Sequence, residues 1–244
     1  SEQTETWHKY VEFGNRTLTG VLLVLAVAAI AGAVVWRRRE GIRRPWVMWL
    51  AAVPLVGTLA QAVLGGITVL VDLHPMAVAS HLLLSMVVIA ACVALVQFAA
   101  ETSDPPGEAI TRDATRYLGD ALIAVTAVII VMGTVVTGSG PHAGDSRTVR
   151  LDLDPRLVSW LHADVVLLFI GLLIGMLALL YVDHSSAVAR RRAWWVVGFA
   201  VLQAGIGYLQ YFTGLPWVLV TAHLLGASLV WVGVWRLRLS LTRR

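Results

Sequence analysis

Seven long apolar runs alternate with short polar segments along the chain. Each run is long enough to cross the hydrocarbon layer of a bilayer as a helix, which takes about 20 residues. The regular apolar–polar alternation of a membrane β-barrel is missing, and helices are the other structure that satisfies its backbone in lipid. The pattern therefore predicts an all-α polytopic membrane protein. The expected spans are Asn15–Val35, Trp46–Leu70, Met76–Ala100, Tyr117–Thr137, Leu157–Val182, Ala193–Phe212 and Trp217–Leu237.

The composition supports a membrane protein and excludes other classes. Of 244 residues, 58% are hydrophobic and 14% are charged, whereas soluble domains have about 45–50% apolar and about 25% charged residues. This chain therefore has more apolar side chains than one soluble core can bury. The single cysteine, Cys92, excludes an internal disulfide framework.

The basic residues predict the orientation of the chain in the membrane. Fourteen of the nineteen fall on one side of the predicted spans, in short tracts between apolar runs. Such an excess marks the cytoplasmic side, and it argues against a nucleic-acid partner, which would need a continuous basic face. We therefore expect the C-terminus and the arginine-rich loops in the cytoplasm. These residues are Arg37, Arg38, Arg39, Arg43, Arg44, Arg112, Arg116, Arg190, Arg191, Arg192, Arg236, Arg238, Arg243 and Arg244.

Two segments of the chain resemble each other at a constant separation of 142 residues. Gln61-Ala-Val-Leu-Gly, followed by His81-Leu-Leu, matches Gln203-Ala-Gly-Ile-Gly, followed by His223-Leu-Leu. Such self-similarity indicates a duplication. We predict two related four-helix bundles, with an eighth span before Ser1. The expected division is an N-terminal half at 1–100, a cytoplasmic linker at 101–116 and a C-terminal bundle at 117–244.

Three histidines lie inside apolar runs, which is costly in a membrane and suggests a functional site. His81, His162 and His223 each lie about two turns from a predicted outer loop, roughly 10 Å deep at 1.5 Å per residue. Each alone could serve only an interhelical hydrogen bond. Together, His162 and His223 could face each other across a bundle and ligate a haem iron. Zinc is less suitable because it requires about four ligands and no thiolate lies nearby.

A polar group lies at the outer mouth of the first span. His8, Glu12 and Asn15 are spaced to share one face of a helix, if that helix extends so far, and Arg16 follows. A carboxylate there could act on a ligand held near His81. Alternatively, Glu12 and Arg16 form only an interfacial pair at a helix start, where the helix dipole favours a carboxylate.

These motifs together resemble the haem A synthase family over nearly the whole chain. Glu12-Phe-Gly-Asn15-Arg16 is similar to the family's Glu-x-x-His-Arg motif, and the segment from Leu64 through Pro75 to His81 resembles its next histidine segment. The matching pieces of the C-terminal half are Val136-Thr-Gly-Ser-Gly-Pro-His142, Leu161-His162-Ala163 and Thr-Ala-His223-Leu-Leu-Gly.

The resemblance implies eight helices in two related halves and the oxidation of a ring methyl of haem o to a formyl group. The product, haem A, serves cytochrome oxidase. In the C-terminal half, His162 and His223 would hold a haem b cofactor. In the N-terminal half, His81 and Glu12 would act on the haem o substrate, with Arg16 beside them. Asn15 stands where the family often has a histidine, and His8 is a candidate replacement.

The resemblance further implies a bacterial plasma-membrane protein with its histidines toward the outer side. Haem O synthase and an electron donor are the expected protein partners, besides the lipid bilayer. Two alternatives stay open from the residues alone. A membrane b-type cytochrome acting only in electron transfer would explain His162 and His223 equally well. A small-molecule transporter would explain the duplication.

Overall fold

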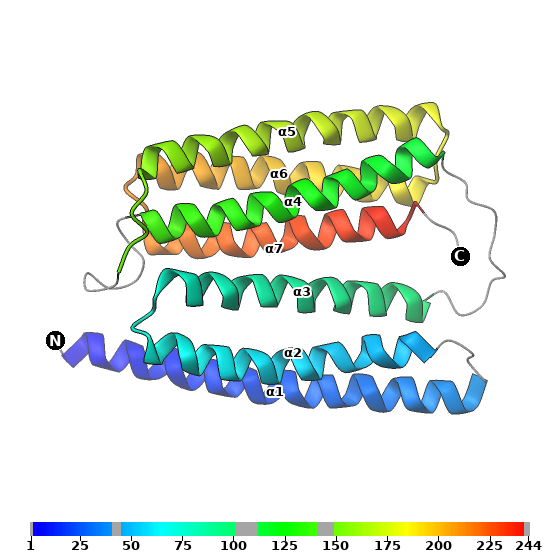
Figure 1. The fold of residues 1–244 in the computed structure, drawn as a ribbon. Coiled ribbons are helices and arrows are strands. Elements are labelled where there is room, and N and C mark those ends of the chain that lie inside the picture. The colour runs from blue at the N-terminus through cyan, green and yellow to red at the C-terminus, as the bar shows by residue number, and fades with distance from the viewer. Residues whose placement is uncertain (1, 41–44, 101–111, 141–148, 242–244) are drawn as a thin grey trace.

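The computed structural model describes residues 2–40, 45–100, 112–140 and 149–241, and these are all-helical. The helices run back and forth in antiparallel fashion, and the described chain has no strand (Figure 1). The seven helices are α1 (Glu2–Glu40), α2 (Pro45–Leu70), α3 (Pro75–Ala100), α4 (Asp113–Ser139), α5 (Pro155–Val182), α6 (Ala187–Phe212) and α7 (Trp217–Leu239).

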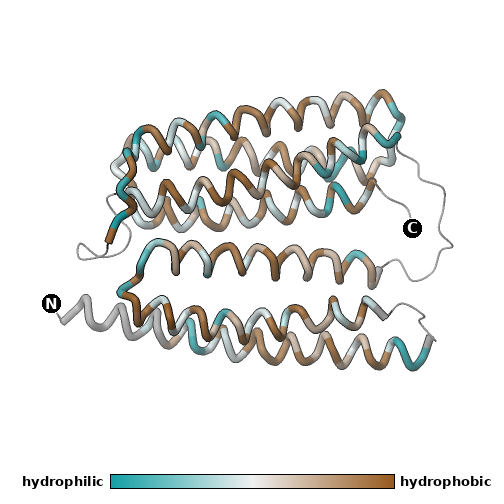
Figure 2. The backbone as a smooth tube through the Cα atoms, viewed as in Figure 1, coloured by the Kyte–Doolittle hydropathy of each residue, from teal (hydrophilic) through white to brown (hydrophobic). Residues whose placement is uncertain are grey.

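Every described helix is long and apolar enough to cross a membrane. Apolar residues dominate the middle of the helices, whereas polar residues gather toward their ends (Figure 2). Many large apolar side chains are exposed, as expected where lipid is the solvent. The protein is therefore an integral membrane protein with seven candidate spans, as the apolar runs predict.

Several helices extend beyond the apolar runs that predicted them. α1 begins at Glu2 rather than at Asn15, and α4 begins at Asp113, inside the predicted linker 101–116. Polar residues continue these helices because the backbone hydrogen bonds of a helix persist outside the apolar layer. The rest of that linker, 101–111, lies outside the described residues.

The four C-terminal helices form a bundle with its own core. α4 and α6 each pack against both α5 and α7, so α5 and α7 are opposite each other across the bundle. Large apolar side chains from all four helices fill the interior, which stabilises the bundle through close packing. The buried members of this core are Leu122, Phe169, Leu173, Met176, Leu180, Ala189, Ala193, Val196, Val230, Val234, Leu237 and Leu241.

The three N-terminal helices join this bundle through α3. α1 packs on α2, α2 packs on α3, and α3 packs on α4 and α7. Met86 of α3, Ile130 of α4 and Trp231 of α7 are buried together at this junction. The Trp231 indole Nε1 donates a hydrogen bond of 2.8 Å to the Met86 carbonyl oxygen, which links the N-terminal helices to the bundle.

We expect Trp231→Phe to destabilise the junction between α3 and α7. The substitution keeps an aromatic ring but removes the bond to Met86, and such bonds within membranes contribute about 0.6–2 kcal/mol. The measurement is unfolding of the purified protein in mixed micelles. Trp235→Phe is the matched control, because the buried Trp235 Nε1 has no hydrogen-bond partner among the described residues. Equal losses in the two variants would contradict the prediction.

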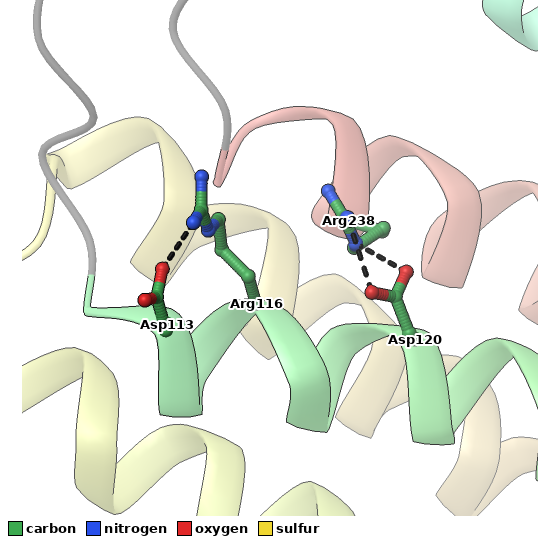
Figure 3. A network of polar contacts seen from close by, with 4 residues as sticks. All are labelled: Asp113, Arg116, Asp120 and Arg238. Atoms are coloured by element: carbon green, nitrogen blue, oxygen red, sulfur yellow. Dashed lines mark hydrogen bonds and ion pairs between the residues drawn. The ribbon is translucent and has the colours of Figure 1, made fainter.

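Ion pairs tie the helices together at the end that carries the arginine tracts. The Arg238 guanidinium contacts both carboxylate oxygens of Asp120, at 2.6 and 3.2 Å, and so connects α7 to α4 (Figure 3). Arg116 pairs with Asp113 one turn away on α4. The end of α7 and the start of α4 therefore lie at the same end of the bundle.

The turns between α2 and α3 and between α6 and α7 have the same backbone geometry. The amide of Leu73 donates to the Thr68 carbonyl at 2.9 Å, and the amide of Leu215 donates to the Gln210 carbonyl at 2.8 Å. Both leucines adopt a positive φ, 57° and 61°, as does the residue before each. These bonds recur 142 residues apart, so the two following helices begin in the same way. The duplication as a whole and the eighth helix stay predictions.

Candidate functional site

The three membrane histidines lie near the starts of their helices, at one end of the molecule. His81 lies in α3, His162 in α5 and His223 in α7, each within two turns of the helix start. These helix starts lie at the same end, opposite the loops that carry the arginine tracts (Figure 1). All three side chains are partly buried. The antiparallel arrangement therefore places the three histidines near the same end of their helices.

His81 and His223 each lie against a glycine on the preceding helix. A Cβ atom added at Gly65 would lie 3.5 Å from Cε1 of His81, and one added at Gly207 would lie 3.2 Å from Cε1 of His223. The missing side chain lets each imidazole approach the backbone of the neighbouring helix. These glycines thus have a specific role beyond general helix packing.

His162 has the same relation to a glycine that the sequence analysis did not identify. A Cβ atom added at Gly133 of α4 would lie 3.5 Å from Cε1 of His162. The repeated segments contain Gly and His sixteen residues apart, but the longer connection between α4 and α5 changes this spacing. Spacing therefore could not reveal Gly133, and only the packing of α4 against α5 does.

Each of the three imidazoles has a buried nitrogen without a partner. Nδ1 of His81, His162 and His223 makes no hydrogen bond within the described residues. Buried polar atoms are nearly always hydrogen-bonded, so a repeated exception points to a functional role. A group bound between the helices would supply a reason to keep these rings inside an apolar protein.

The positions of His162 and His223 fit the ligation of a haem. They belong to α5 and α7, the opposite helices of the bundle, and each lies within two turns of the start of its helix. Two histidines on facing helices are a common way for a bundle to hold a haem iron between them. Within the described residues, no cluster of three or more His, Cys, Asp or Glu could hold a metal ion without such a macrocycle.

We expect Gly207→Ala to displace the imidazole of His223 and, if that ring ligates a haem, to weaken haem binding in the C-terminal bundle. The new methyl group would force the His223 ring to move by a few tenths of an ångström, and ligand geometry tolerates only about 0.5 Å. A decrease in haem b affinity of up to about tenfold should follow. Spectroscopic titration measures it. Gly205→Ala on the same helix is the control, since its Cβ would meet no atom within 4 Å.

The residues predicted for the N-terminal site lie on two helices, α1 and α3. Asn15 and Arg16 are exposed on α1, and α1 and α3 each pack on α2 rather than on each other in the described chain. The side chains of His8 and Glu12 lie outside the described residues, although both positions belong to α1. The sequence analysis placed His8, Glu12 and Asn15 on one face only if the first helix extends that far. α1 does extend to Glu2, so these three positions share one helix face.

The fold and the histidine positions define a helical membrane protein with three histidines near one end of its helices. The chain belongs to the cytochrome oxidase assembly protein family COX15-CtaA, whose model matches residues 1–235. A comparison with curated proteins gave no match. The family match covers all three histidines and every described helix at least in part.

Proposed function

We propose that the protein is a haem A synthase that oxidises a ring methyl of haem o to a formyl group. This proposal rests on three histidines near one end of the helices, each with a glycine of the preceding helix beside its ring. They occur in a chain of the cytochrome oxidase assembly family. Two of them would hold a cofactor, and the third would hold the substrate. The apolar surface of the helices suits a substrate with a long apolar tail.

In this proposal, His162 and His223 hold haem b through one imidazole nitrogen each. A haem held by two histidines would supply electron transfer. The bundle core beneath the histidines, including Phe169 and Val230, keeps water away from the site. Gly133 and Gly207 provide the space in which the two rings lie.

His81 would bind the iron of haem o in the N-terminal half. Asn15 would supply a hydrogen bond or hold a water there, and His8 is the candidate for a second ligand. Glu12 would stabilise positive charge that develops at the oxidised carbon or accept a proton, with Arg16 setting its position. Loss of haem A production in Glu12→Ala is the test of the role given to Glu12.

Haem extraction and mass analysis of the purified protein test the proposal. With haem o supplied, we expect haem b together with haem o and its hydroxylated and formyl derivatives. Haem b without any haem o derivative would overturn the proposal and favour an electron-transfer cytochrome, which the facing pair His162 and His223 would serve equally well. A protein without haem would exclude both functions and favour a transporter.

The proposed reaction also defines partners and orientation. The preceding step must attach the apolar tail to haem, so haem O synthase is the expected supplier, and an electron carrier must take part in each turnover. The arginine-rich end of the helices would face the cytoplasm, since basic loops are retained there. The histidines would then lie toward the outer side of a bacterial plasma membrane.

A further inference from the structure

Two partly buried glutamines make the same hydrogen bond to the backbone of two of the histidines. Gln61 Nε2 of α2 donates to the carbonyl oxygen of His81 at 2.9 Å. Gln203 Nε2 of α6 donates to the carbonyl oxygen of His223, also at 2.9 Å. Each glutamine lies one turn before the glycine that faces the same histidine. Each histidine therefore has a hydrogen bond to its backbone carbonyl and a glycine, rather than a larger residue, beside its ring.

The surroundings of each glutamine are built to accommodate its carboxamide. In the N-terminal half, Gln61 Nε2 also donates to Ser85 Oγ at 2.5 Å, and that hydroxyl itself donates to the His81 carbonyl at 3.1 Å. In the C-terminal half, the carboxamide of Gln203 occupies the space that a side chain at Gly226 would fill. Different neighbours thus preserve the same bond.

Stability alone does not account for these glutamines. The Oε1 atoms of Gln61 and Gln203 are buried without a hydrogen-bond partner in the described residues, and a buried unpaired oxygen carries a free-energy cost. Leucine would pack between the helices without this cost. The amide instead fixes which residue of one helix lies opposite which residue of the next, because its donor reaches a single carbonyl.

We propose that Gln61 and Gln203 are positioning residues, each of which sets the place of an iron-binding histidine relative to the preceding helix. Gln203 acts on His223 and the haem b site, and Gln61 acts on His81 and the substrate site. This proposal rests on the proposed function. Neither glutamine touches the iron. Both act by holding the histidine helix in register while the adjacent glycine leaves room for the ring.

The test compares Gln203→Leu with Gln210→Leu in the full chain. Gln210 lies two turns further along α6, has a buried Oε1, and makes no described hydrogen bond to a histidine. The readouts are haem b bound per protein and the electron paramagnetic resonance spectrum of the oxidised haem. Residues that orient a metal ligand typically change affinity by about 10- to 100-fold. We expect that decrease and an altered spectrum in Gln203→Leu only.

The outcomes separate this proposal from the proposed function. Wild-type affinity and spectrum in Gln203→Leu would overturn the positioning role, whereas wild-type protein without haem b would overturn the proposed function instead. If Gln203→Leu does not accumulate, Gln203→Met replaces it, because methionine keeps the length of the side chain but has no hydrogen-bond donor. The same two measurements are made on it, and the same outcomes support or overturn the proposal. Gln61→Leu should lower haem o conversion and leave the haem b spectrum unchanged. A changed haem b spectrum there would contradict separate roles.

Discussion

Replacing His223 with alanine is expected to lower the affinity for haem b by more than about tenfold. Changes in residues that only orient a metal ligand already cost about 10- to 100-fold, and this change removes a proposed ligand itself. His162→Ala should have a similar effect, because either loss leaves the iron with one histidine. The measurement is the haem b content of the purified variants with their reduced-minus-oxidised spectra. Haem A production should be lost together with haem b.

His184→Ala provides the control for this experiment. His184 lies in the turn after α5, at the opposite end of the bundle from His223. Its loss should leave the haem b spectrum unchanged. Full haem b occupancy in both His162→Ala and His223→Ala would show that these two histidines of α5 and α7 do not hold the cofactor.

Replacing His81 with alanine should abolish conversion of haem o while haem b stays in place. Misplacement of a substrate by about 1 Å can reduce a rate by 100-fold, and loss of the only described histidine that would bind this iron should cost at least as much. The haem b site should survive because His81 belongs to α3, outside the bundle of α4–α7. Product analysis by mass, with the haem b spectrum recorded on the same sample, measures both effects.

The matched control on the same segment is His74→Ala. His74 lies in the turn before α3, where its Nδ1 accepts a hydrogen bond of 3.3 Å from the backbone amide of Met76. That contact is local and exposed, so conversion should continue at a normal rate. Simultaneous loss of haem b and activity in His81→Ala would contradict the assignment of His81 to a separate substrate site.

The helix count and the depth of the histidines follow from the sequence because lipid imposes a simple rule. Each span must be apolar and must satisfy its own backbone, so long apolar runs predict α1 to α7 without knowledge of their packing. A histidine's distance along its helix then gives its depth. For this reason His81, His162 and His223 could be identified as candidates before any neighbour was known.

Helix ends were harder to predict because they lie outside the lipid layer, where a helix no longer has to be apolar. Outside the apolar layer, the polar residues from Glu2 onward continue α1 through ordinary backbone hydrogen bonding. The positions of Asn15 and Arg16 relative to His81 were also beyond prediction. They depend on which helices touch, and both α1 and α3 pack on α2.

The sequence by itself determined the membrane class, the seven apolar helices and the three histidines near the starts of α3, α5 and α7. It did so because hydropathy and distance along a helix are properties of each segment alone. Only the tertiary structure decided that α5 and α7 lie opposite each other, that Gly133 faces His162 and that Gln203 holds the backbone of His223. These relations depend on the rotation and register of one helix against another, which side-chain packing sets across the whole bundle.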